Sequence, residues 1–352
     1  MQFVQRYPEI MARFDRFWNG RETDRPVLYL SAPKDNPDRS IPAPPSLEDA
    51  TQRVLPEYFV ARARHELATT AYFAEGFPHV FPNFGPLLLH GCIGGDLDLS
   101  HSGTTWFPPF LSEVTQFTSL RFDRTGKWWP RLLRVVEALF QEVGDEMLIS
   151  CTDIGGVGDV VASSVGRQIL LDIAERPEAV KAAVEHCRTL WLEAYEDLQR
   201  LISQHQDVTT VWWPFVSRGR VHMTECDISA LISPRAFKRV FLGDLAAMYR
   251  RLDHGAYHLD GPGTECHVPA LLEQPGLHCI QWVPGPGVSA LAHAAMLRRI
   301  QEAGVSITCS AAVPDVEEMC RVFDKRRLFL RVGCQSEAEA KQLLDNVLRW
   351  CA

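Results

Sequence analysis

Short apolar runs alternate with longer amphipathic stretches along most of the chain. The runs contain few polar residues, which is typical of parallel strands that are buried on both faces. Eight of them are predicted to be strands: 25–33, 77–84, 146–153, 209–215, 253–263, 279–285, 305–310 and 328–334. Helices are predicted after each run, at 47–75, 128–144, 167–175 with 177–205, 234–252, 265–273, 289–303, 314–324 and 336–350.

Regular alternation of strand and helix over this length is typical of a single α/β domain of the (β/α)8 TIM barrel type. We expect such a barrel over residues 26–352. Before it, Tyr7, Ile10, Phe14 and Phe17 recur at helical spacing. They predict an N-terminal helical extension over residues 1–25 that covers one end of the larger body. A doubly wound open sheet is the structural alternative.

Composition narrows the class of protein. The formal net charge of −8 argues against a surface for nucleic acid or for an anionic membrane. No run of about 18 apolar residues occurs, and no apolar segment of the signal-peptide type is visible at the start. We therefore expect a cytoplasmic protein without a membrane span. The ten cysteines form no CxxC pair, so most are expected to be small buried apolar residues.

The stretch 253–263 carries the clearest candidate chemistry. His258 and Asp260 are two residues apart, so on a strand both side chains point to the same side. Gly261 and the Pro-Gly that follows it end the strand and let a ligand approach the backbone. An imidazole beside a carboxylate suits metal binding or proton transfer, and a purely structural pairing is the alternative.

In a (β/α)8 barrel the active site lies where the carboxyl ends of the strands meet the following loops. Zinc takes thiolate, imidazole and carboxylate ligands, so we expect His258 and Cys334 to bind it together with one further residue. The candidates for the third ligand are Asp260, Glu225, Cys226 and Cys309. Other residues at the predicted strand ends are Asn83, Asp153 and Trp282, the last of which forms a pocket wall or part of the core.

Five short blocks carry a further signal. They are Thr152-Asp153-Ile154-Gly155-Gly156, Leu171-Asp172-Ile173 with Pro177-Glu178, Asp227-Ile228-Ser229-Ala230-Leu231-Ile232-Ser233-Pro234-Arg235-Ala236-Phe237, His258-Leu259-Asp260-Gly261 and Val332-Gly333-Cys334. In this order and spacing they resemble the uroporphyrinogen decarboxylase superfamily. The resemblance implies a (β/α)8 barrel. It also implies one of two chemistries: decarboxylation of a porphyrinogen without a cofactor, or methyl transfer from a corrinoid to a thiol with zinc held by a His-x-Cys pair and a later Cys.

The methyltransferase branch of that superfamily is the better match. True uroporphyrinogen decarboxylases carry an arginine-containing segment near the N-terminus, whereas residues 26–34 read Pro-Val-Leu-Tyr-Leu-Ser-Ala-Pro-Lys. His258 matches the His and Cys334 the late Cys, but Asp260 stands where the first Cys is expected and makes a harder site. The resemblance implies a metal-dependent methyltransferase that moves a methyl group between a corrinoid, carried by a partner protein, and a small acceptor.

This interpretation assigns roles to the candidate residues. His258 and Cys334 bind zinc, Asp260 is the third ligand or orients His258, and Cys226 is a further candidate ligand. The residues that hold substrate or move protons are Asp153, Glu225 and Asp260, and those that bind a small-molecule substrate are Asn83, Trp282 and Arg218. One alternative is a cofactor-independent decarboxylase or other lyase, in which Arg218 or Arg220 holds a carboxylate of a small substrate. Another is a catalytically silent barrel that binds a small molecule.

Overall fold

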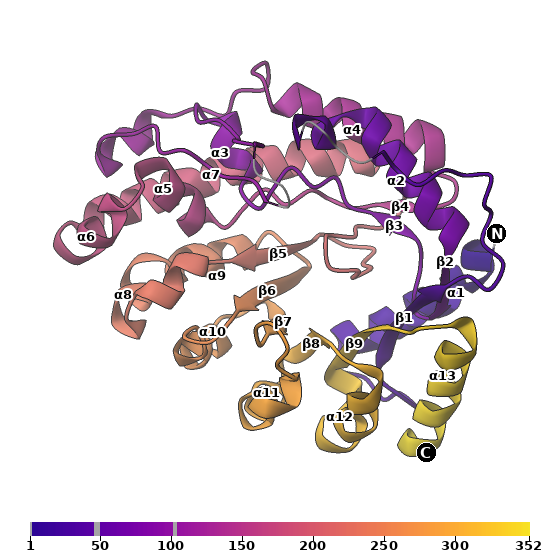
Figure 1. Ribbon diagram of the computed structural model, residues 1–352. Helices are drawn as coiled ribbons and strands as arrows, with labels where there is room; N and C mark the ends of the chain where they lie inside the picture. The colour runs from indigo at the N-terminus through magenta and orange to yellow at the C-terminus, as the bar shows by residue number, and fades with distance from the viewer. Residues whose placement is uncertain (1, 46–49, 101–103) are drawn as a thin grey trace.

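The computed structural model describes residues 2–45, 50–100 and 104–352. Its largest sheet has seven strands in the order β2-β1-β9-β8-β7-β6-β5 and curves through the middle of the molecule (Figure 1). All neighbouring strands in it are parallel except β1 and β2. The strands are β1 (Val27–Pro33), β2 (Thr70–Ala74), β5 (Val221–Glu225), β6 (His254–Asp260), β7 (Leu277–Val283), β8 (Ser306–Ser310) and β9 (Leu328–Gly333).

A second sheet pairs β3 (His79–Val80) with β4 (Leu148–Ile149) in parallel. Beyond β4, the Cys151 N–H donates a hydrogen bond to the Thr210 carbonyl at 2.8 Å. Among the described residues no strand ladder joins this sheet to the larger one. The expected α/β class with a mostly parallel sheet is confirmed, but the hydrogen bonding of the described residues does not close into the single eight-stranded barrel that the sequence predicts.

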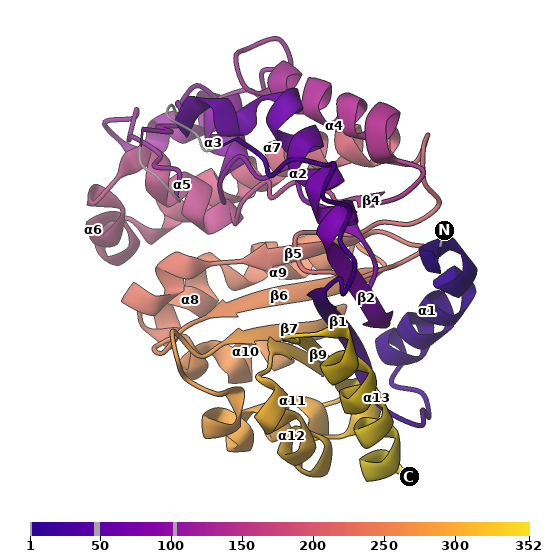
Figure 2. The same cartoon turned by 45° about the vertical axis from the view of Figure 1, so that its right-hand side comes forward.

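Helices α10 to α13 lie along the outside of the curved sheet, and α2, α4 and α7 lie beyond β3 and β4 (Figures 1 and 2). None of the described helices is long and apolar enough to cross a membrane. The α-helices are α1 (Gln2–Trp18), α2 (Pro56–Thr69), α3 (Leu88–Cys92), α4 (Trp129–Val143), α5 (Val157–Val165), α6 (Gln168–Glu175), α7 (Pro177–Ile202), α8 (Pro234–Val240), α9 (Leu242–Tyr249), α10 (Val268–Leu272), α11 (Ala294–Glu302), α12 (Val316–Val322) and α13 (Glu337–Cys351).

The predicted strands 77–84 and 146–153 are reduced to the two-residue β3 and β4, and the predicted helix 234–252 is divided into α8 and α9. Other predicted elements differ in type. The helix predicted over 47–75 ends at Thr69, and the next five residues form the edge strand β2; residues 47–49 lie outside the described residues. Residues 209–215 form no regular strand, only an isolated bridge from Thr209 to Ser217. The parallel strand at this point of the chain is β5, in a stretch predicted to be a loop. Its polar residues, such as His222 and Thr224, interrupt the apolar pattern although the whole strand is buried.

Helix α1 covers the amino-terminal end of the large sheet. The rings of Phe14 and Phe17 pack edge-on against Phe329 of β9, with centroids 5.5 and 6.0 Å away. Trp18, at the end of the helix, donates a hydrogen bond from Nε1 to the Val216 carbonyl at 2.9 Å. The predicted N-terminal helix is therefore confirmed, and its buried face belongs to the same hydrophobic core as the sheet.

Candidate functional site

The carboxyl ends of β5 and β6 bring together the polar groups of the candidate site. Glu225 of β5 pairs with His258 of β6, which pairs with Gln281 of β7. Residues paired in this way in a parallel sheet share one face, so these three side chains lie on the same face. Asp260 follows two residues after His258, and Asp227 begins the short 3-10 helix that comes directly after β5.

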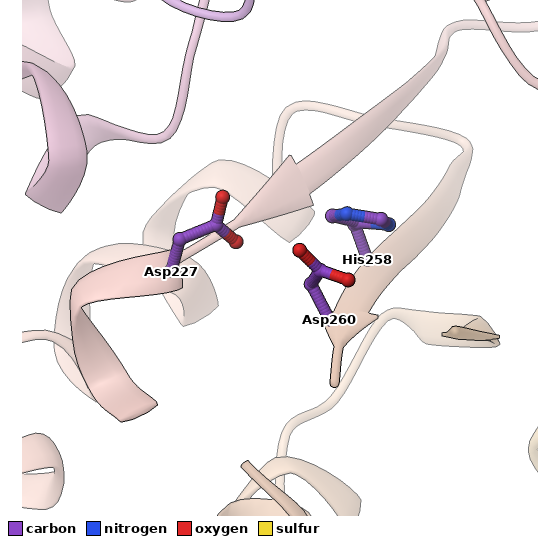
Figure 3. A group of neighbouring side chains, drawn as sticks. All are labelled: Asp227, His258 and Asp260. Carbon is purple, nitrogen blue, oxygen red and sulfur yellow. The ribbon is translucent and has the colours of Figure 1, made fainter. Parts of the chain in front are cut away.

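Asp227, His258 and Asp260 form a group that is suited to bind a metal ion (Figure 3). One ligand atom of each lies within 4.8 Å of the other two. The two aspartates are exposed and His258 is half-buried, so the group is accessible from solvent. Figure 3 shows the Asp227 carboxylate pointing toward Asp260 and His258 from the neighbouring element.

The imidazole of His258 is held in one orientation. Its Nδ1 donates a hydrogen bond to Oε1 of Gln281 at 2.6 Å. The ring also lies edge-to-face against Trp212, with centroids 5.0 Å apart. Because Nδ1 carries the proton in this arrangement, Nε2 keeps its lone pair and can bind a metal ion or accept a proton.

The backbone at Asp227 is held by a buried aspartate of α5. Asp159 accepts hydrogen bonds from the N–H groups of Asp227 and Ile228 at 2.9 and 2.8 Å. These bonds fix the start of the 3-10 helix and therefore the position from which the Asp227 side chain extends. Desolvation by the surrounding groups raises the pKa of Asp227; His258 partly offsets this rise, and Asp260 adds to it.

Two buried carboxyl groups lie behind the exposed group. Glu225 accepts a hydrogen bond from the Gly156 N–H at 2.9 Å, and Asp153 accepts one from the Gly155 N–H at 3.0 Å. Burial raises the pKa of both well above the usual range, and neighbouring carboxylates raise it further. Gly156 is required here because an added Cβ would lie 2.6 Å from the Glu225 carbonyl oxygen. Asp153 and Glu225 therefore lie close enough to interact electrostatically with each other and with Asp227.

The two cysteines predicted to bind zinc are not part of this group. Cys226 is buried and, lying between Glu225 and Asp227, faces the other way, toward Gly158 of α5. Cys334 is buried near Glu339 of α13, and burial raises the pKa of its thiol to about 11. Neither thiol joins the ligand atoms of His258 and Asp260. The predicted ligand set of His258, Cys334 and a third residue is thus not brought together in the group of Asp227, His258 and Asp260.

The three residues predicted to bind substrate are spread over the molecule. Arg218 precedes β5, at the end opposite Glu225, where it pairs with Asp207 at 3.1 Å. Trp282 lies on the opposite face of β7 from Gln281 and packs against His293. Asn83 is exposed beyond β3, beside a cavity of ≈ 310 Å³. Arg218 and Trp282 therefore have no place in the site, and Asn83 borders a cavity outside the group of three ligands.

Sequence reasoning missed two residues that complete the site. The sequence indicates Asp227 only as the first residue of a motif, although Glu225 and Asp227 have the same two-residue spacing as His258 and Asp260. The same spacing at the ends of two successive strands could have predicted that Asp227 lies beside His258 and Asp260. Gln281 carried no signal of its own, because its partner is set by the register between β6 and β7.

Comparison of this chain with family models and with curated proteins finds no match. The function is therefore argued from the geometry of the site. Two carboxylates and one imidazole are a donor set that suits a divalent cation such as Zn²⁺, Mn²⁺ or Fe²⁺.

Proposed function

We propose that this protein is a metal-dependent lyase that acts on a small carboxylated substrate at the carboxyl ends of β5 and β6. The observation that carries the proposal is the close approach of one ligand atom each from Asp227, His258 and Asp260, within 4.8 Å. We also propose that the two sheets together make up the (β/α)8 arrangement. The place of the group at the carboxyl ends of β5 and β6 supports this, because active sites of such barrels lie at that end of the strands.

Asp227, His258 and Asp260 would hold a divalent ion, which would supply a Lewis acid for a substrate oxygen. Side chains of the protein bind and orient the substrate and move the proton. Asp227 and Asp260 face solvent, so a substrate can reach them, and the hydrogen bond to Gln281 engages Nδ1 of His258, which leaves the lone pair of Nε2 for binding. Asp153 and Glu225 are the candidates for moving a proton to or from the substrate, since buried carboxyl groups held by backbone N–H groups keep a defined position.

Lyase chemistry fits this donor set better than methyl transfer to a thiol, which the sequence suggested first. A zinc site that activates a thiolate acceptor uses soft sulfur ligands, and both candidate cysteines lie outside the group. For decarboxylation, the bond to the leaving CO2 breaks, the electron pair stays on the substrate carbon, and a proton from Asp153 or Glu225 is added there. This reaction needs no redox partner and no corrinoid.

The first test is metal binding by isothermal titration calorimetry with Mn²⁺ and Zn²⁺, on protein stripped with a chelator. We expect about one ion per chain for the wild type. Asp260→Asn and His258→Gln each remove a metal ligand. Metal affinity should fall by more than the roughly 10–100-fold that is typical when only the hydrogen-bond partner of a ligand is removed. Cys334→Ser and Cys226→Ser are matched controls and should bind as the wild type does. Wild-type protein that binds neither ion, or control variants that lose binding, would sink the proposal.

The second test is catalytic. The metal-loaded protein is incubated with a panel of small dicarboxylates and 2-oxo acids, and CO2 release is followed. Turnover should require the metal and should fall by roughly 100-fold or more in Asp153→Asn if Asp153 transfers the proton. Metal binding should be retained in that variant, which separates loss of proton transfer from loss of the ion.

A further inference from the structure

One arginine of the large sheet faces the same side as the candidate metal site. In-register pairs run from β6 to β9 and place the following residues on one face: His258, Gln281, Thr308 and Phe329. Arg331 follows Phe329 by two residues and so lies on that face as well, one layer nearer the carboxyl ends of the strands. Its register partner on β1 is Tyr29.

The guanidinium group of Arg331 is supported by a ring and pairs with no carboxylate in the part of the chain that the structure describes. It lies over the ring of Trp213, 5.5 Å from the centroid. Trp213 is buried, and its Nε1 donates a hydrogen bond to Oγ1 of Thr308 at 2.8 Å. Within the described ranges Arg331 forms no ion pair, whereas Arg25 and Arg220 each have a bidentate carboxylate partner. An exposed arginine held over a fixed ring is prepared to bind an anion.

The surroundings of Arg331 leave its charge available. The nearby phenol of Tyr29 donates a hydrogen bond to the Phe77 carbonyl at 2.8 Å. Burial, and after it the charge of Arg331, lowers the pKa of His79 to about 4, so the imidazole is neutral at pH 7. Burial raises the pKa of Glu66 of α2, and the nearby charge of Arg331 offsets a small part of this rise, but the two side chains form no ion pair.

We propose that Arg331 binds a carboxylate of the substrate and fixes which end of it reaches Asp227, His258 and Asp260. The inference rests on the proposed lyase function and names its substrate class: a small dicarboxylate. Three strand spacings of roughly 4.8 Å separate β6 from β9, so the two ends lie less than roughly 14 Å apart across the curved face. The carboxylate-rich side at β5 and β6 repels the second carboxylate group of the substrate, and Arg331 attracts it, so the substrate is held in one direction.

The test compares glutarate, butyrate and inorganic phosphate as probes, titrated calorimetrically into the Mn²⁺-loaded protein. We expect the wild type to prefer glutarate over butyrate by at least about 10-fold, because a bidentate arginine contact is strong. Arg331→Met should lose that preference while binding Mn²⁺ within about twofold of wild type. Arg331→Lys should keep part of it, since the charge remains and the planar fork is lost. Arg218→Met, at the opposite end of the strands, is the control.

The outcomes separate this inference from the proposed function. If Arg331→Met binds Mn²⁺ normally and still prefers glutarate, the role of Arg331 is disproved and the metal site stands. If the wild type binds no metal but binds glutarate through Arg331, the anion site stands and the proposed metal-dependent function fails. Phosphate that binds more tightly than glutarate would replace the dicarboxylate with a phosphorylated substrate and overturn the substrate class.

Discussion

At the scale of single residues, the site depends on which nitrogen of His258 faces the other ligands. The hydrogen bond from Nδ1 to Gln281 decides this, and Gln281 is itself buried and in register with His258. Partners of this kind orient an imidazole and raise its basicity toward a metal ion. The pair of strands β6 and β7 thus positions the imidazole through one amide side chain.

Replacing Gln281 tests this role directly. Gln281→Met removes the acceptor and should weaken Mn²⁺ or Zn²⁺ binding by roughly 10–100-fold, because the imidazole is free to rotate or to change tautomer. Gln281→Glu restores an acceptor with a negative charge and should bind the ion at least as tightly as wild type. Calorimetric titration measures both. If the two variants bind equally, Gln281 serves packing alone.

The sequence predicted part of this residue arrangement. The spacing of His258 and Asp260 placed both on one side of a strand, and the structure keeps them together. Cys334, which the sequence predicts to join them, is not part of the group, because its thiol is buried elsewhere after the last strand. Such tertiary contacts leave no local pattern.

At the scale of elements, α1 shows how a terminal helix contributes to the main core. Phe14 is fully buried, contacts Phe17 on its own helix and packs against Phe329 of β9. The helix therefore closes the amino-terminal end of the sheet, while the opposite end carries the site. The spacing of its aromatic residues predicted this helix from the sequence, because a helix repeats every 3.6 residues.

Truncation of this contact should destabilise the whole protein. We expect Phe14→Ala to lower the free energy of unfolding by roughly 3–5 kcal/mol, since the ring leaves a cavity between α1 and β9. Urea denaturation followed by circular dichroism measures the change. Arg16→Ala, on the exposed side of the same helix, should stay within about 0.5 kcal/mol of wild type. Equal stability of the two variants would show that α1 does not belong to the cooperative core.

At the scale of the whole molecule, buried ionisable groups shift stability with pH in opposite directions. Burial lowers the pKa of four histidines to about 4: His79, His90, His222 and His254. Each takes up a proton more readily in the unfolded chain, so each removes stability as the pH falls from about 6.5 toward 4. Burial raises the pKa of Asp244 to about 6, so its contribution to stability grows as the pH falls through the same window.

His90 offers a way to isolate one of these contributions. Its Nε2 donates a hydrogen bond to the Pro108 carbonyl at 3.2 Å, and its ring is fully buried between Phe107 and Phe110. Relative to His90→Gln, the wild type should lose stability by up to about 1.4 kcal/mol per pH unit between pH 6.5 and pH 4. Urea denaturation at pH 7.5, 6 and 5 measures the difference. A difference that does not change with pH would mean that His90 titrates alike in both states.

The sequence by itself determined the α/β class, most helices and parallel strands, and the pair His258 and Asp260, because periods of 3.6 and 2 residues and the spacing at a strand end are local properties. Only the tertiary structure decided the rest. It decided which strands pair and that β5, not residues 209–215, forms the strand at this point of the chain. It also brought Asp227 and Gln281 to the site. These features depend on the register between segments that are far apart in the chain. A register between strands is set by packing of the whole core, and no single stretch of sequence encodes it.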